Sequence, residues 1–117
     1  MKVRRYKRRN KYNAKPTQYR GWRFDSKAEA EYAELLDTRQ QTGQVLFWLR
    51  QVPFDLTDDD RYKADFLVLE SDGTMYAVDV KGMQTPRFKK IVKLWEKYGI
   101  MPLKIVNKNT GTEIIEP

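Results

Sequence analysis

A turn between two apolar segments decides more about the fold of this chain than any other part of its sequence. Residues 62–70 and 74–81 are rich in apolar side chains, and Ser71-Asp72-Gly73 separates them. A three-residue loop that ends in a left-handed glycine is a common closure of a β-hairpin. Such a loop pairs Glu70 with Thr74. Because both segments are apolar on both faces, we expect them to be the central strands of a covered sheet.

The predicted register places two carboxylates against each other. Asp65 falls opposite Asp79, with Cβ atoms about 4.5–5.5 Å apart, and Lys81 points to the same face. Opposed acids in an apolar sheet repel each other and lose hydration, which a divalent cation would offset. Oxygen ligands without Cys or His predict Mg²⁺, with Mn²⁺ as a substitute. Three alternatives stay open: one Asp lies in a turn, a different loop length shifts the register, or Lys63 or Lys81 neutralises the pair as an ordinary ion pair.

The remaining pattern predicts an α/β fold in which a helix, three strands, a helix, a strand and a last edge strand follow one another. Ser26 and Glu29 spell a capping box, and Thr85-Pro86 is a typical helix start. The predicted helices run from Ser26 to about Gln40 and from Thr85 to Tyr98, and the predicted strands cover 45–49, 62–70, 74–81, 102–106 and 112–115. Pro53 is expected to interrupt an extension of the first strand over 51–56, residues 58–60 to form a loop, and residues 1–20 to be extended or disordered.

The first predicted helix supplies a third candidate acid. Its apolar face consists of Ala28, Tyr32, Leu35 and Leu36. Glu29 lies about 65° from the centre of that face, Glu31 about 95°, and Glu34 nearly opposite. Glu29 is therefore expected to point inward, and the other two acids to be solvated. One alternative remains, because Glu at the third position of a capping box is common for structural reasons alone.

Composition excludes several kinds of enzyme. The chain has no cysteine and no histidine, which excludes a disulfide scaffold, a thiolate zinc site and a Ser-His-Asp triad. Its 117 residues are enough for one domain. No apolar run approaches the about 18 residues that span a membrane. We therefore expect a cytoplasmic protein with no membrane contact.

The charge is concentrated at the N-terminus. The net charge is +7, and residues 1–27 hold 11 basic side chains and one acidic one, whereas residues 28–117 hold 12 and 15. Four aromatic residues are interleaved with these charges: Tyr6, Tyr12, Tyr19 and Trp22. A basic segment with aromatic side chains indicates a nucleic-acid partner. A solubilising or expression-derived tail and ribosome or RNA binding are the alternatives.

The order of acids and elements resembles the PD-(D/E)XK nuclease superfamily. Glu29 on the first helix, Asp65 on one hairpin strand and Asp79-Val80-Lys81 on the other fit its pattern, and residues from about 24 to 107 follow its αβββαβ core. Residues 24–30, 64–66 and 79–82 are also similar to small phage proteins related to Holliday-junction resolvases. Ala64 stands where the signature has proline, and Asp79 where glutamate is commoner.

This resemblance implies a restriction-endonuclease-like fold, with a mixed central sheet flanked by helices, over residues 24–117 after a basic arm over 1–23. It implies Mg²⁺-dependent hydrolysis of DNA with Glu29, Asp65, Asp79 and Lys81 as catalytic residues. Asp65, Asp79, the Val80 carbonyl and Glu29 would hold the metal. Lys81 would orient the attacking water or stabilise the pentacovalent phosphate. Gln51, near the end of the first strand, could touch the site, but we interpret it as a polar residue at a strand edge.

Among substrates, the resemblance favours four-way DNA junctions cut by a symmetric homodimer, in the host cytoplasm if a phage encodes the chain. Phe47, Trp48 and Leu49 are candidate interface side chains, although burial in the core fits them as well. The predicted DNA contacts are Arg4, Arg5, Lys7, Arg8, Arg9, Lys11, Arg87, Lys89 and Lys93. A general phage DNA endonuclease and a non-catalytic basic nucleic-acid-binding module are the alternatives.

Overall fold

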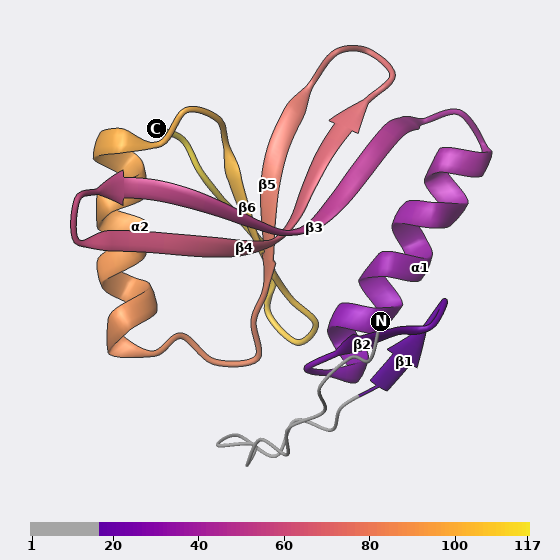
Figure 1. Ribbon diagram of the computed structural model, residues 1–117, viewed down its shortest axis with the longest axis horizontal. Coiled ribbons are helices and arrows are strands. Elements are labelled where there is room, and N and C mark those ends of the chain that lie inside the picture. Colours follow the sequence, from indigo (N-terminus) through magenta and orange to yellow (C-terminus); the bar gives the residue numbers. More distant parts are fainter. Residues whose placement is uncertain (1–16) are drawn as a thin grey trace, which may run out of the picture.

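Five strands form one mixed sheet in the order β3-β4-β5-β6-β7 (Figure 1). The structure is a computed structural model that describes residues 17–117. The strands are β3 (Val45–Thr57), β4 (Asp60–Glu70), β5 (Met75–Val80), β6 (Leu103–Asn107) and β7 (Gly111–Ile115). β5 and β6 run parallel, and the other neighbours run antiparallel. The chain is therefore an α/β protein, as predicted.

Both predicted helices form where their capping residues place them. α1 (Lys27–Gln41) begins after Ser26, whose hydroxyl accepts a hydrogen bond from the Glu29 amide at 3.1 Å. α2 (Pro86–Tyr98) begins after Thr85, which accepts from the Phe88 amide at 3.1 Å. These bonds satisfy amides that have no partner inside the helix.

The two helices cover opposite faces of the sheet, and β5 separates the two halves of the core. Tyr76 and Val78 belong to a buried cluster with Leu36 of α1. Ala77, between them, belongs to a second cluster with Trp95 of α2. Because successive side chains of a strand point to opposite faces, β5 contributes to both clusters. Figure 1 shows α1 and α2 on either side of the sheet.

The turn over residues 71–73 confirms the predicted register. Gly73 has φ 93°, and the Glu70 amide donates to the Thr74 carbonyl at 2.8 Å. The β4–β5 ladder pairs Leu69 with Met75 and ends with Phe66 opposite Val78. The ladder stops one residue before Asp65.

β4 leaves β5 at this point but stays paired with β3. The β3–β4 ladder continues from Arg50 opposite Phe66 to Thr57 opposite Asp60. Phe66 packs in the α1 cluster, whereas Ala64 packs in the α2 cluster. The β3–β4 hairpin therefore passes from one half of the core to the other at Asp65, where the sheet forks.

β3 is longer than predicted. Pro53 does not interrupt it but pairs with Lys63 within a continuous strand. Proline lacks a backbone N–H, which an edge strand tolerates because one of its sides has no ladder partner. The expected loop is also shorter, since Asp60 already belongs to β4.

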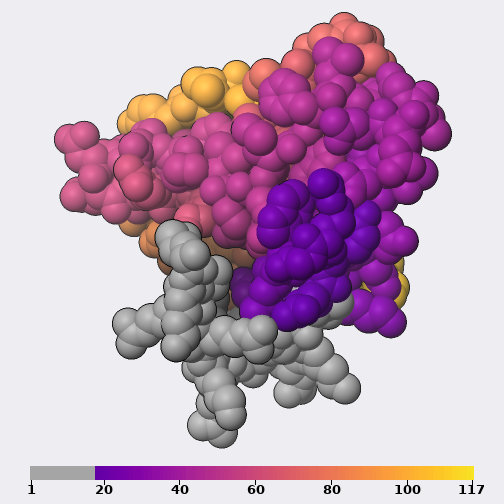
Figure 2. All heavy atoms as spheres, turned by 45° about the vertical axis from the view of Figure 1, so that its right-hand side comes forward, coloured from indigo at the N-terminus to yellow at the C-terminus, as the bar shows by residue number. Residues whose placement is uncertain are grey.

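A small β-hairpin precedes α1 and was not expected from the sequence. β1 (Thr17–Tyr19) and β2 (Trp22–Phe24) pair antiparallel around Arg20 and Gly21, which have φ 55° and 78°. Two left-handed residues in succession are typical of a tight two-residue hairpin turn. Residues 17–20 are thus ordered, and residues 17–23, predicted as part of the basic arm, contact α1. Figure 2 shows this hairpin in indigo on the surface, beside the sheet strands.

One expectation about apolar side chains is wrong. Leu35 is half exposed rather than on the buried face of α1, because Ala33 and Leu36 fill that face. Trp48 lies in the core, which is one of the two places considered for it, and it meets Phe66 edge-on with 5.7 Å between ring centroids. Leu49 is exposed. No helix within residues 17–117 has the length and apolarity to cross a membrane.

Candidate active site

Asp65 lies at the fork between β4 and β5. Its Oδ2 accepts a hydrogen bond from the Val80 amide at 2.8 Å. By the register, this amide would otherwise face the backbone of β4, so the carboxylate takes the place of a backbone acceptor. Asp65 is thereby fixed beside the end of β5.

Asp79 is the most deeply buried acid of residues 17–117, with 2% of its surface exposed. Its Oδ2 accepts a hydrogen bond from the Tyr62 hydroxyl. Its Oδ1 lies 3.3 Å from the Lys81 ammonium in an ion pair but accepts no hydrogen bond in the described part of the chain. The same ammonium lies 4.5 Å from the ring centroid of Phe88, at the start of α2. One oxygen of a buried carboxylate therefore remains available to a further partner.

Glu29 points inward from the first turn of α1, as predicted, and is 5% exposed. Its Oε1 accepts a hydrogen bond from Gln51 Nε2 at 3.3 Å. Gln51 lies on β3 between the pairs Arg50–Phe66 and Val52–Ala64, which places it opposite Asp65. The interpretation of Gln51 as a polar strand-edge residue is therefore wrong, because its amide holds a site carboxyl group.

The three acids share one electrostatic environment. Burial, and then the charge of Asp25, raise the pKa of Glu29 to about 7. Burial raises the pKa of Asp65 to about 9, and the charges of Asp79 and Glu29 add to this effect. The raised pKa values of Glu29 and Asp65 indicate that these groups lie close to other acids in a region of low polarity. Such perturbed groups are typical of functional sites.

The predicted catalytic residues are thus brought together, but they are not arranged as a finished metal site. Among residues 17–117, no group of three or more potential ligands surrounds one point closely enough to hold a metal ion. Asp65 is turned toward the Val80 amide, and Asp79 toward Tyr62 and Lys81. The ordinary Lys81–Asp79 ion pair considered as an alternative is formed. The metal and the Val80 carbonyl as its ligand stay predictions.

A family described as “Protein of unknown function (DUF1064)” matches residues 9–110. The chain belongs to the DUF1064 family. In this DUF1064 protein the matched segment includes Glu29, Asp65, Asp79 and Lys81. Neither a curated protein nor a solved structure matches the chain.

Part of the predicted DNA surface of the DUF1064 protein lies on α2. Arg87, Lys89 and Lys93 are all exposed, and Arg87 donates to the Arg61 carbonyl at 3.2 Å. Lys90, by contrast, forms an ion pair with Asp60 at 3.2 Å. The other predicted contacts are Arg4, Arg5, Lys7, Arg8, Arg9 and Lys11, which lie outside the described residues.

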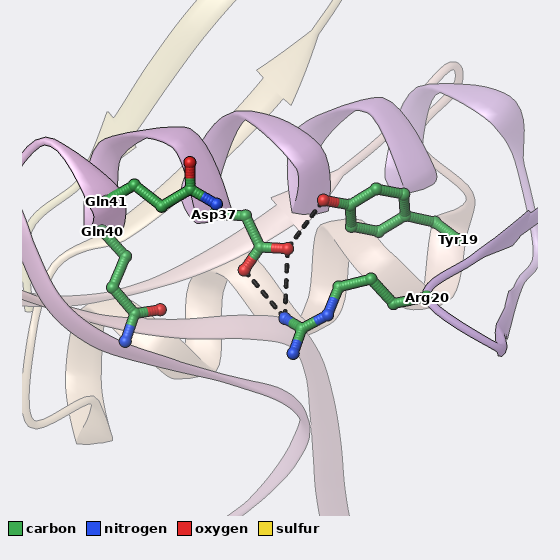
Figure 3. Close-up of a pocket in the computed structure, with 5 residues that line it drawn as sticks. All are labelled: Tyr19, Arg20, Asp37, Gln40 and Gln41. Carbon is green, nitrogen blue, oxygen red and sulfur yellow. Dashed lines mark hydrogen bonds and ion pairs between the residues drawn. The ribbon is translucent and has the colours of Figure 1, made fainter.

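A second group of polar side chains fastens the β1–β2 hairpin to α1 (Figure 3). Asp37 accepts hydrogen bonds from the Tyr19 hydroxyl at 2.7 Å, from Arg20 Nη1 at 2.8 Å and, on its buried side, from Trp48 Nε1 at 3.1 Å. Tyr19, Arg20 and Asp37 line a surface pocket of about 570 Å³ together with Gln40 and Gln41. The hydrogen bonds of Asp37 within residues 17–117 join the hairpin, α1 and β3, so Asp37 acts as a structural clamp between these elements.

Sequence reasoning missed one residue of the candidate site of the DUF1064 protein, Tyr62, and misjudged another, Gln51. Tyr62 reaches Asp79 only because the β3–β4 hairpin crosses between the two halves of the core, and no sequence signal announces that crossing. Gln51 was noticed but underrated. Extending the β3–β4 pairing back from the acidic turn would have placed it opposite Asp65.

Proposed function

We propose that this DUF1064 protein is a metal-dependent DNA endonuclease with a restriction-endonuclease-like fold. The observation that carries the proposal is the meeting of three carboxyl groups and one ammonium group at the fork of the sheet. Glu29 comes from α1, Asp65 from β4 and Asp79 from β5, and Lys81 follows directly after β5. The element order from α1 to β6, with its parallel β5–α2–β6 unit, supports the proposed fold.

The side chains fit a hard divalent cation. The donor set consists of carboxylate oxygens, which Mg²⁺ and Mn²⁺ prefer, and Asp79 Oδ1 is buried without a hydrogen bond. A cation would also offset the repulsion that raises the pKa of Asp65. Asp65, Asp79 and Glu29 are the residues that would hold it, with the Val80 carbonyl as a further donor. Binding would require Asp65 or Glu29 to turn its carboxyl group toward Asp79.

The proposed reaction is hydrolysis of a phosphodiester. A water oxygen forms a bond to phosphorus, the bond from phosphorus to one sugar oxygen breaks, and that oxygen leaves with a proton as a hydroxyl group. When bound, Mg²⁺ supplies charge neutralisation at the phosphate and lowers the pKa of a coordinated water. The Lys81 ammonium stabilises the negative charge that develops on the phosphate oxygens. Gln51 keeps the Glu29 carboxyl group directed inward.

Branched DNA, in particular the four-way junction, is the proposed substrate class. Cutting opposed strands requires two sites, so a symmetric homodimer is part of the proposal. β3 is an edge strand with Leu46 and Leu49 exposed, which makes its outer side a candidate contact between protomers. Arg87, Lys89 and Lys93 would contact phosphates, because α2 begins beside Lys81 and presents these cations to solvent.

The decisive test compares cleavage by the wild-type protein with cleavage by Asp79→Asn. Asn is similar in shape and still accepts a hydrogen bond from Tyr62, so the fold should persist. We expect Mg²⁺-dependent nicking of a four-way junction to fall at least 100-fold while junction binding survives. Glu70→Gln is the matched control, since Glu70 is also a hydrogen-bonded acid next to a tyrosine, but it pairs with Arg39 at the other end of β4.

The outcomes separate the candidate functions. Paired symmetric nicks on the junction, with little cutting of linear duplex, support the resolvase. Equal cutting of both substrates leaves a general endonuclease. Binding without any cleavage in Mg²⁺ or Mn²⁺ contradicts the enzyme and leaves a non-catalytic nucleic-acid-binding module.

A further inference from the structure

The β1–β2 hairpin presents an aromatic ring to solvent among cations. Trp22 is 37% exposed, whereas Trp48 is 8% and Trp95 is 0% exposed. Large aromatic side chains are usually buried more fully than this when they serve the core alone. Figure 2 shows the hairpin on the surface of the molecule. Its exposed ring is therefore a candidate contact for a ligand.

Neighbouring side chains hold this ring in place. Trp22 meets Trp48 edge-on, with 5.6 Å between ring centroids. The guanidinium carbons of Arg20 and Arg50 lie 5.0 Å and 5.4 Å from the centroid of Trp22. Arg50 also lies 4.4 Å from the centroid of Phe24. Because Asp37 fixes both Arg20 and Trp48, the ring is preorganised and its position does not depend on a ligand.

The cations beside Trp22 differ in whether an acid neutralises them. Arg20 is paired with Asp37 at 2.8 Å. Arg23 is exposed, and neither Arg23 nor Arg50 forms an ion pair with any residue of the described chain. Arg50 donates to the Arg23 carbonyl at 2.8 Å, and its Nε is buried without a hydrogen bond. Arg50 therefore brings a positive charge to the ring without an ion pair, whereas Arg23 follows Trp22 on β2 and points to the opposite face of the hairpin.

This surface adjoins the candidate active site through β3. Arg50 faces the hairpin, and the next residue, Gln51, donates to Glu29. An aromatic face together with a guanidinium group that forms no ion pair within residues 17–117 fits a nucleotide, whose base stacks and whose phosphate is anionic. A base inside a duplex already has neighbours on both of its faces, so only an unpaired base can stack on Trp22.

We propose that the β1–β2 hairpin binds an unpaired nucleotide of a DNA strand, with its base on Trp22 and a phosphate at Arg50. The position of this nucleotide next to the cut rests on the proposed endonuclease function, whereas the binding itself does not. The hairpin thereby favours substrates with single-stranded character beside the scissile bond. A flap offers such bases, a four-way junction offers them only where base pairs open at its branch point, and a blunt duplex offers none.

The test is binding of oligothymidylate to the Asp79→Asn protein without metal, so that no cleavage is needed. Trp22 is the exposed one of the three tryptophans, so stacking should quench the intrinsic fluorescence. Trp22→Phe should remove this quenching yet keep an aromatic face and the fold. Trp22→Ala should weaken binding of a dye-labelled oligothymidylate, measured by anisotropy, roughly tenfold or more.

Tyr98→Ala is the matched control, because Tyr98 is an exposed aromatic with Lys97 5.3 Å from its ring centroid, but on α2. It should leave the quenching unchanged. Three results would each overturn the inference. A blunt duplex of equal length quenches the fluorescence as strongly as the single strand, the single strand causes no quenching, or Trp22→Ala binds the oligothymidylate with unchanged affinity. If one of these results is found but the wild-type protein cuts junctions, the proposed endonuclease function still stands. If the single strand quenches the fluorescence but the protein cuts no DNA, the nucleotide-binding surface is supported and the endonuclease function is contradicted.

Discussion

The backbone of Gln51 gives a prediction whose sign is opposite to the usual rule for strands. Gln51 has φ 55°, which lies in the left-handed region. Residues other than glycine and asparagine rarely adopt this backbone conformation. Gln51→Ala and Gln51→Gly both remove the amide that donates to Glu29. The two variants then differ only in how their backbones accept this conformation, so we expect the glycine variant to be the more stable.

The magnitude follows from two opposing effects. A left-handed conformation costs an alanine about 1–2 kcal/mol, and glycine nothing. At an ordinary strand position, a glycine variant is less stable than an alanine variant by about 0.5–1 kcal/mol, because glycine has more conformational entropy in the unfolded chain. Gln51→Gly should therefore exceed Gln51→Ala in unfolding free energy by about 0.5–1 kcal/mol, or roughly 2–5 °C in Tm.

Leu49 provides the matched control. It lies two residues earlier on β3, is exposed, and is not among the residues with positive φ. Leu49→Gly should be less stable than Leu49→Ala by about 0.5–1 kcal/mol. Subtracting the Gly-minus-Ala stability difference at position 49 from that at position 51 cancels the entropy effect that both positions share. What remains is the strain of the left-handed conformation at position 51, about 1–2 kcal/mol.

Urea denaturation of the four variants in metal-free buffer measures these differences. Equal slopes with denaturant would show that the variants unfold in the same manner. If Gln51→Ala is as stable as Gln51→Gly, the backbone at Gln51 is not strained. Backbone strain of this kind is typical of functional sites. Its absence would weaken the argument that Gln51 belongs to the site.

Four further predictions follow from the site and its surroundings. Mg²⁺ at ten times its dissociation constant should stabilise the wild-type protein by about 1.4 kcal/mol and leave Asp79→Asn unchanged, as measured by thermal unfolding. Tyr62→Phe leaves a buried oxygen of Asp79 without its donor and should lower the metal-free unfolding free energy by about 1–3 kcal/mol; an unchanged value would contradict that hydrogen bond. Asp37→Ala should lower it by about 2 kcal/mol and open the hairpin, so that acrylamide quenches tryptophan fluorescence more strongly; unchanged quenching would show that the clamp is dispensable. Hydrogen bonds from Arg39 and then Tyr76 hold the pKa of Glu70 below its usual value. The folding stability that these bonds provide is therefore fully present above the pKa that Glu70 has in the unfolded chain. It is lost as the pH falls through the lower pKa that Glu70 has in the folded protein. Glu70→Gln should therefore lose less stability than the wild type between pH 5 and pH 3, and parallel curves would refute this.

The central register and both helices could be predicted because local rules determine them. The glycine at position 73 requires one turn geometry, and that geometry fixes the pairing of residues 66–69 with 75–78. Ser26 and Thr85 cap their helices where a side-chain oxygen is needed. The inward direction of Glu29 followed from helical periodicity. These features depend on residues close together in the chain.

The missed features depend on tertiary contacts. The β1–β2 hairpin is stabilised by Asp37, which lies 17 residues beyond Arg20, and each of its own strands has only three residues. Pro53 is tolerated only because β3 lies at the edge of the sheet. The sequence of β3 alone does not show which position the strand takes in the sheet. Tyr62 meets Asp79 across the fork. Periodicity along one element carries no information about such contacts.

The hydrogen bond from the Val80 amide gives Asp65 two tasks at once. Its carboxyl group closes the end of the β4–β5 ladder and is also one of the three acids of the candidate site. Any shorter or apolar replacement would leave a main-chain donor unsatisfied, so under the proposed function lost activity and weakened strand pairing would appear together in one variant. A variant meant to abolish the proposed activity and keep the fold should therefore change Asp79. At Asp65, a change in the proposed chemistry is also a change in the architecture.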